Sequence, residues 1–305
     1  MRLLLYLGAL AVAALIAISL NWAFEHYRPR AQATTQFDDP RLSFRPAAHL
    51  AQGAVRAFRA MPAAEQQALR EELIASTSTL AVWAREHANT ASVLCLGERH
   101  EDATRAFIAQ QVLPRINYQV LMLETSQTQL QVMIESFDKG HRVDLLSASL
   151  NGILTATRAQ VPAIRIVAID ERQNARRSAQ TQPSRESLLV ARIRSEWRPG
   201  QRHTVLFGAL HCRAAAGWMM HRLIHEDARI QRAGAMSAVV LARYREASAQ
   251  VLMYLLEEIG LGDDIVVIPR VSHFPKLVQK WLPLTVDAFA GFDSALLFDD
   301  HRTQP

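Results

Sequence analysis

The stretch S-V-L-C-L-G-E-R-H-E-D at residues 92–102 decides the fold that we expect for this chain. Residues 93–96 form an unbroken apolar run, which is typical of a β-strand covered by helices on both faces. Gly97 ends the run, and ionisable side chains follow, among them Glu98 and His100. Ligands of open α/β sheets bind beyond the carboxyl ends of the strands. We therefore expect Glu98 and His100 to lie in a functional crevice.

A second copy of this pattern occurs at residues 203–212, H-T-V-L-F-G-A-L-H-C. Gly208 and His211 have the same spacing as Gly97 and His100. A single histidine after a strand is more often a solvated or capping residue than a catalyst. Two strands that both end in Gly-x-x-His favour a functional role for both histidines.

Short apolar runs alternate with longer amphipathic segments, which indicates repeated βα units. Strands are predicted at residues 93–96, 120–123, 164–169, 204–207, 238–241, 265–268 and 295–298. Helices are predicted at residues 47–60, 63–87, 103–113, 128–138, 145–160, 184–197, 214–232, 247–259 and 276–289. The predicted fold class is α/β, with a mostly parallel sheet of about seven strands and helices on both faces. We assign residues 46–302 to this one α/β domain.

The N-terminus carries a long apolar segment at residues 3–24 without a charged side chain. As a helix rising ~1.5 Å per residue it would reach ~33 Å, enough to cross a bilayer. A cleaved signal peptide usually has a shorter apolar core with small residues close behind it. We interpret residues 1–24 as an uncleaved transmembrane signal anchor, and residues 25–45 as a linker.

The compartment of the domain is predicted from the charges around this segment. Arg2 precedes it and Arg28 and Arg30 follow it, so positive charge alone does not set the orientation. The short basic tail resembles an export signal, which predicts a single-pass membrane protein with an extracytoplasmic, periplasmic domain. The cysteines, Cys95 and Cys212, do not decide the compartment, and we expect them to be buried free thiols.

Composition restricts the partners of the chain. The formal net charge is +5, and the arginines are not interleaved with aromatic residues. This predicts no nucleic-acid partner. The most basic window, residues 158–202, has two interpretations: solvated helix faces, or a site for an anionic ligand or a membrane surface.

Ionisable side chains also follow other predicted strands. Glu124 directly follows the second apolar run, and Asp170 and Arg172 follow the third. Parallel strands share one carboxyl edge, so we expect these groups near His100 and His211. Each has a structural alternative, because Glu124 can cap the next helix and Asp170 can pair with Arg172.

This set of side chains permits two kinds of chemistry. His100, His211 and Glu124 could hold a divalent metal ion that lowers the pKa of a bound water. Without a metal, one histidine could act as general base, oriented by Glu98 or Glu124, while the other histidine or Arg172 stabilises an oxyanion. The spacing does not select between the two.

Together these motifs resemble the superfamily that joins erythromycin-esterase-like proteins, ChaN-like haem-binding proteins and the TraB/Tiki group of membrane-linked metalloproteases. The matching pieces are Leu96-Gly97-Glu98-Arg99-His100, Leu123-Glu124, Ile169-Asp170, Gly208-Ala209-Leu210-His211 and the closing run at residues 291–299.

Each branch of the resemblance implies a different use of one crevice. The esterase-like branch implies that His100 activates water with support from Glu124 and Glu98. The Tiki-like branch implies a metal-dependent peptidase, and the ChaN-like branch implies haem binding.

The residues and the resemblance together predict a membrane-anchored hydrolase. It would activate water to cleave an ester or amide bond in a small-molecule or peptide substrate. The alternative is a haem- or ligand-binding protein without catalysis. The expected cofactor is accordingly a divalent metal ion, haem or none.

Overall fold

A computed structural model of the chain describes residues 45–160, 164–170, 185–243, 246–273 and 289–300. The chain divides into two compact units, Met1–Ser43 and Phe44–Pro305, and the described residues belong to the second. No helix among these described residues is long and apolar enough to cross a membrane. The predicted anchor at residues 3–24 and most of the linker lie outside the described residues, as does the predicted helix at residues 276–289 except for its last residue.

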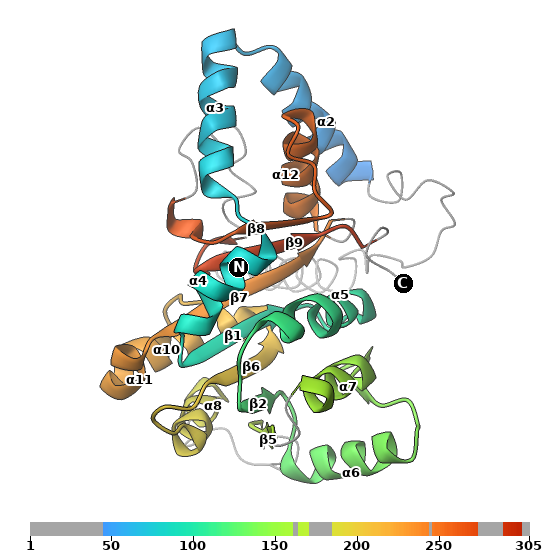
Figure 1. Cartoon of the computed structure of the whole chain (residues 1–305), viewed down its shortest axis with the longest axis vertical. Helices are drawn as coiled ribbons and strands as arrows, with labels where there is room; N and C mark the ends of the chain where they lie inside the picture. Colours follow the sequence, from blue (N-terminus) through green and yellow to red (C-terminus); the bar gives the residue numbers. More distant parts are fainter. Residues whose placement is uncertain (1–44, 161–163, 171–184, 244–245, 274–288, 301–305) are drawn as a thin grey trace, which may run out of the picture. The chain divides into compact units, whose positions relative to one another are not determined.

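The core of the fold is a seven-stranded sheet with the order β5-β2-β6-β1-β7-β9-β8 (Figure 1). All neighbouring strands are parallel except β8 and β9, which are antiparallel. The strands are β1 Val93–Glu98, β2 Val120–Leu123, β5 Arg165–Ala168, β6 His203–Gly208, β7 Ala235–Ala242, β8 Ile265–Ile268 and β9 Ser294–Phe298. The predicted α/β class, mostly parallel, is therefore confirmed, and each predicted apolar run forms or overlaps a strand of this sheet.

Helices cover both faces of the sheet, and the side chains of the central strand show why. Val93 and Cys95 of β1 point into one apolar cluster, and Leu94 and Leu96 point into the other. The first cluster includes side chains of α2, α3, α8, α10, α11 and α12, and the second includes those of α4, α5, α6 and α7. Figure 1 shows α2 and α12, which are in contact, side by side. A strand buried on both faces reads as a continuous apolar run, as the sequence of β1 does.

The helices have the following bounds: α2 Arg45–Arg59, α3 Ala63–Ser76, α4 Leu80–Glu86, α5 Asp102–Phe107, α6 Gln127–Asp138, α7 Asn151–Gln160, α8 Arg185–Glu196, α9 Ala209–Cys212, α10 Met219–Glu226, α11 Ala228–Ala233 and α12 Ala247–Glu258. Shorter helical turns lie at η1 Ala88–Thr90, η2 Ile108–Val112, η3 Leu113–Arg115 and η5 Val271–His273.

The prediction of one helix over residues 145–160 is wrong at its beginning. Residues Asp144–Leu145 and Ala148–Ser149 pair as the antiparallel strands β3 and β4, and α7 begins only at Asn151. The turn between them places Leu146 and Ser147 at φ 51° and 71°. The carbonyls of Leu145 and Ala148 both accept hydrogen bonds from buried Arg105, a tertiary contact that overrides local helix propensity.

Two other long helices predicted from the sequence are interrupted. The segment at residues 63–87 breaks after α3, where Ser78 pairs with Val267 and Thr79 caps α4. The segment at residues 214–232 contains Gly217 at φ +92° and is divided again where Asp227 caps α11. In each case a cap or a backbone bond outside the helix competes with the continuous helical ladder.

Candidate functional site

The site lies at the carboxyl edge of the sheet, and its first part comes from the end of β1. Glu98 is 2% exposed and accepts hydrogen bonds at Oε1 from Arg105 Nε at 2.9 Å and Nη2 at 2.8 Å. The same carboxylate oxygen lies 3.2 Å from His100 Nδ1. A carboxylate beside Nδ1 fixes the ring orientation and favours the tautomer with the proton on that nitrogen, in which Nε2 can accept a proton.

Arg105 is the residue that fixes this carboxylate. Its side chain is 3% exposed, and Nη1 donates to the carbonyls of Leu145 and Ala148, each at 2.6 Å. Its Nη2, which donates to Glu98, also lies 3.4 Å from His100 Nδ1. One guanidinium thus joins the β3–β4 hairpin to the end of β1.

The second part of the site is Glu124, at the end of β2. Its Oε2 accepts a hydrogen bond of 2.8 Å from the backbone N–H of Gly208 and lies 3.7 Å from His100 Nε2. A Cβ at Gly208 would stand 3.2 Å from His100 Nε2 and 3.4 Å from Glu124 Oε2. Glycine at the second Gly-x-x-His motif therefore lets these two side chains approach closely, and a Cβ there would make the His100 ring shift by a few tenths of an ångström.

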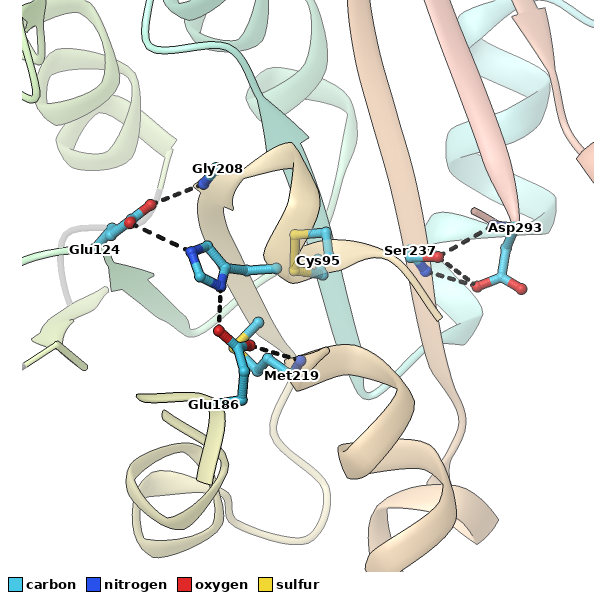
Figure 2. Close-up of a disulfide and its surroundings, with 9 residues drawn as sticks. Cys95, Glu124, Glu186, Gly208, Met219, Ser237 and Asp293 are labelled. Atoms are coloured by element: carbon cyan, nitrogen blue, oxygen red, sulfur yellow. Dashed lines mark hydrogen bonds and ion pairs between the residues drawn. A yellow bond between two sulfur atoms is a disulfide. The ribbon is translucent and has the colours of Figure 1, made fainter. Parts of the chain in front are cut away.

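The third part of the site is His211, in the short helix α9 that follows β6. Its Nε2 lies 3.8 Å from Glu124 Oε1, and its Nδ1 lies 2.7 Å from Glu186 Oε1. The Nδ1 contact has the distance of an ion pair but not the geometry of a hydrogen bond. Glu186 is held in turn by the backbone N–H of Met219 at 2.8 Å. Figure 2 shows Glu124 and Glu186 on either side of the imidazole ring.

Arg185 connects the acidic groups of the site. Its Nη2 donates to Glu124 Oε1 at 2.5 Å and to Asp170 Oδ2 at 2.6 Å, while its Nη1 lies 2.8 Å from His211 Nε2. Burial lowers the pKa of the Arg185 guanidinium, but the hydrogen bonds with Asp170 and Glu124 outweigh this effect and raise it. Arg185 therefore supplies a fixed positive charge at the centre of the site.

Both Gly-x-x-His motifs converge because β1 and β6 are adjacent parallel strands. Their register pairs Gly97 with Phe207 and Glu98 with Gly208. A Cβ at Gly97 would stand 3.0 Å from the backbone Cα of Ala209, so the first glycine permits α9 to pack against β1.

The expectation of two free thiols is wrong. Cys95 and Cys212 form a disulfide with a Cα–Cα distance of 5.5 Å, and the chain has no free cysteine. Their pairing could not be predicted from the sequence, because 117 residues separate the two positions. Neighbouring strands bring them together: Cys95 lies in β1, and Cys212 ends the helix that follows β6.

The structure brings together most of the side chains predicted for the site. Glu98, His100, Glu124 and His211 all lie in one cluster, together with Asp170, which the sequence had placed at a strand end. Arg172 lies outside the described residues.

Three site residues were not predicted from the sequence: Arg105, Arg185 and Glu186. Arg105 lies inside a helical segment and has no motif of its own. Arg185 and Glu186 begin α8, within the basic window at residues 158–202, and Arg185 is the part of that window which reaches the site. The excess of arginine was the only available signal.

The predicted metal ligands, His100, His211 and Glu124, lie close together, with Arg185 beside two of them. No group of three or more histidine, cysteine, aspartate or glutamate side chains suited to a metal ion occurs among the residues that the structure describes. Two of the predicted ligand atoms, His211 Nε2 and Glu124 Oε1, face the guanidinium of Arg185. A second cation there would meet the charge of Arg185 directly.

The chain matches no protein-family model, and no curated protein matches its sequence.

Proposed function

We propose that this chain is a hydrolase that activates a water molecule, without a metal, to cleave an ester or amide bond. The observation that carries the proposal is the orientation of His100. Its Nδ1 faces the buried carboxylate of Glu98, its Nε2 faces Glu124, and the side chain stays 32% exposed. A carboxylate-oriented imidazole that a substrate can reach is the arrangement of a general base.

In the proposed reaction the attacking water binds to His100 Nε2 and Glu124 Oε2. The 3.7 Å between these atoms allows one water molecule to contact both. The water oxygen attacks the carbonyl carbon while His100 Nε2 takes a proton from the water. The bond to the leaving group then breaks, and His100 returns the proton to the leaving oxygen or nitrogen.

Arg185, with His211 beside it, is placed to stabilise the oxyanion that forms on the carbonyl oxygen. Arg185 carries a positive charge that its hydrogen bonds to Glu124 and Asp170 hold in position. Preorganised charge of this kind costs no rearrangement at the moment of reaction. His211 is 12% exposed at its side chain and orients Arg185 through the contact at Nε2.

We further propose that the domain acts outside the cytoplasm, attached to the membrane through residues 3–24. The disulfide Cys95–Cys212 supports this placement, because disulfides persist in oxidising compartments and are rare in the cytosol.

The test begins with the whole chain, purified in mild detergent without a chelator. Hydrolysis is measured on a panel of aryl esters and short peptides for the wild type, His100→Ala and the control His141→Ala, whose residue is exposed. We expect His100→Ala to lower kcat/KM by about 10²–10⁴-fold, the usual contribution of a general base. Its free energy of unfolding should change by less than ~1 kcal/mol, as at most partly exposed positions.

The outcomes separate the competing functions. Retained turnover in His100→Ala, or loss of folding in that variant, contradicts the proposal. A stoichiometric transition metal that disappears in His100→Ala/His211→Ala would replace it by the metal-dependent peptidase, and a Soret band would replace it by haem binding.

A further inference from the structure

The two cysteines of the chain are placed at the two Gly-x-x-His motifs. Cys95 lies in β1, two residues before Gly97, and Cys212 directly follows His211. Their disulfide joins the strand that presents the general base to the turn that presents the second imidazole (Figure 2).

The turn that carries His211 has little secondary structure of its own. Helix α9 spans only the four residues Ala209–Cys212, and a helix of this length does not hold itself in water. The next regular element, α10, begins at Met219. Between the two helices, the backbone N–H of Ala214 donates to the carbonyl of Gly291 at 2.5 Å.

The non-covalent partners of His211 come from elements other than β1. Glu186 belongs to α8, Glu124 follows β2, and Arg185 also begins α8. These contacts set where the imidazole points. Glu124 also lies 3.7 Å from His100 Nε2, so it links the two imidazoles without a covalent bond. The disulfide is the covalent link between β1 and the turn that carries His211.

We propose that Cys95 and Cys212 are positioning residues for His211, and that only the oxidised chain holds its imidazole in place against Arg185 and Glu124. This inference rests on the proposed hydrolase function. When the bond forms, the two thiols lose two protons and two electrons to an oxidised thiol–disulfide carrier protein. A dithiol reverses the step by supplying two electrons and two protons, and is itself oxidised.

Burial makes the disulfide a lasting constraint. Cys95 and Cys212 are both 0% exposed, so a reductant in solution reaches the sulfurs only when the structure opens. The packing beside the disulfide is also tight, since a Cβ at Gly97 would stand 3.3 Å from Cys212 Cβ. The disulfide therefore fixes α9 where the packing around Gly97 is tightest.

The test compares the whole wild-type chain with Cys95→Ala/Cys212→Ala, at a temperature where circular dichroism shows both folded. Ser237→Ala is the matched control: Ser237 pairs with Cys95 in the sheet register and is equally buried, but its side chain hydrogen-bonds Asp293 (Figure 2). We expect the double cysteine variant to lose at least tenfold in kcat, with KM within about threefold, because a transition-state interaction is displaced. Ser237→Ala should keep its kcat within about twofold.

A double-mutant cycle distinguishes positioning from stabilisation alone. If the disulfide acts through His211, then removing it in a His211→Ala background should cost no more than about a further twofold in kcat. A full additional tenfold loss there, or an unchanged kcat in the folded cysteine variant, would overturn the proposal. Two reactive thiols in the denatured wild-type protein would overturn it as well.

A second measurement tests the proposal even if the alanine variant does not fold or if no hydrolysis is found. Carbon–proton NMR of the histidine rings is recorded on the wild type before and after reduction with a dithiol. We expect the His211 signals to shift on reduction and those of exposed His141 to stay. Unchanged His211 signals in a reduced, folded chain refute the positioning role, whereas absent His100-dependent turnover refutes only the proposed function.

Discussion

Replacing Arg105 by methionine tests whether the site rests on a buried ion pair. The side chains of Arg105 and Glu98 are 3% and 2% exposed, and two nitrogens of the guanidinium donate to one carboxylate oxygen. Methionine keeps much of the apolar volume and removes the charge. Glu98 then keeps a charge in a place where water does not reach it.

The magnitude follows from this burial. Removing one partner of a buried ion pair costs about 3–5 kcal/mol, because the remaining charge is left uncompensated. The carbonyls of Leu145 and Ala148 also lose their donor, although the exposed turn between them lets water reach part of the hairpin. We therefore expect Arg105→Met to lower the free energy of unfolding by about 3–5 kcal/mol.

The assay is urea unfolding followed by circular dichroism, with two companions. Arg142→Met breaks the ion pairs with Asp144 and Asp102, in which all three side chains are about half exposed or more, and should cost less than about 1 kcal/mol. Glu98→Leu/Arg105→Met buries no lone charge and should be less destabilised than the sum of its single variants by about 2–3 kcal/mol. A cost below about 1 kcal/mol for Arg105→Met, equal to that of the exposed pairs, would refute the argument.

Two further predictions concern other parts of the chain. Gly208→Ala places a Cβ 3.2 Å from His100 Nε2 at an ordinary φ of −52°, so the ring must shift by a few tenths of an ångström. Since a misplacement of 1 Å costs about 10²-fold, we expect kcat/KM to fall about fourfold, with Gly53→Ala, in open space, as the unaffected control. Hydrogen bonding from Arg229 lowers the pKa of Asp227 from 3.8 to about 2, so its contribution to stability is present above pH ~4 and is lost as the pH falls through about 2. Asp227→Asn should therefore be less stable than the wild type by up to about 1 kcal/mol at pH 6 and equal to it near pH 2, as thermal unfolding will show.

The sequence located the strands well because a strand buried on both faces leaves a continuous apolar run. Residues 120–123 and 265–268 were predicted with the bounds that the structure gives to β2 and β8. Helix continuity was harder to predict. The hairpin before α7 exists because Arg105 binds its carbonyls, and no pattern at residues 144–149 shows a partner so far away.

For the site, the sequence by itself determined which side chains stand at strand ends: Glu98, His100, Glu124 and His211. Their position after apolar runs is local information, carried by residues that follow one another in the chain. The tertiary structure alone decided what each of them faces. Arg185 reaches Glu124 across 61 residues of sequence, and Cys95 reaches Cys212 across 117, through strand order and register. Strand order depends on how all the helices and strands pack together, so the charge balance and the covalent link of the site appear only in the folded chain.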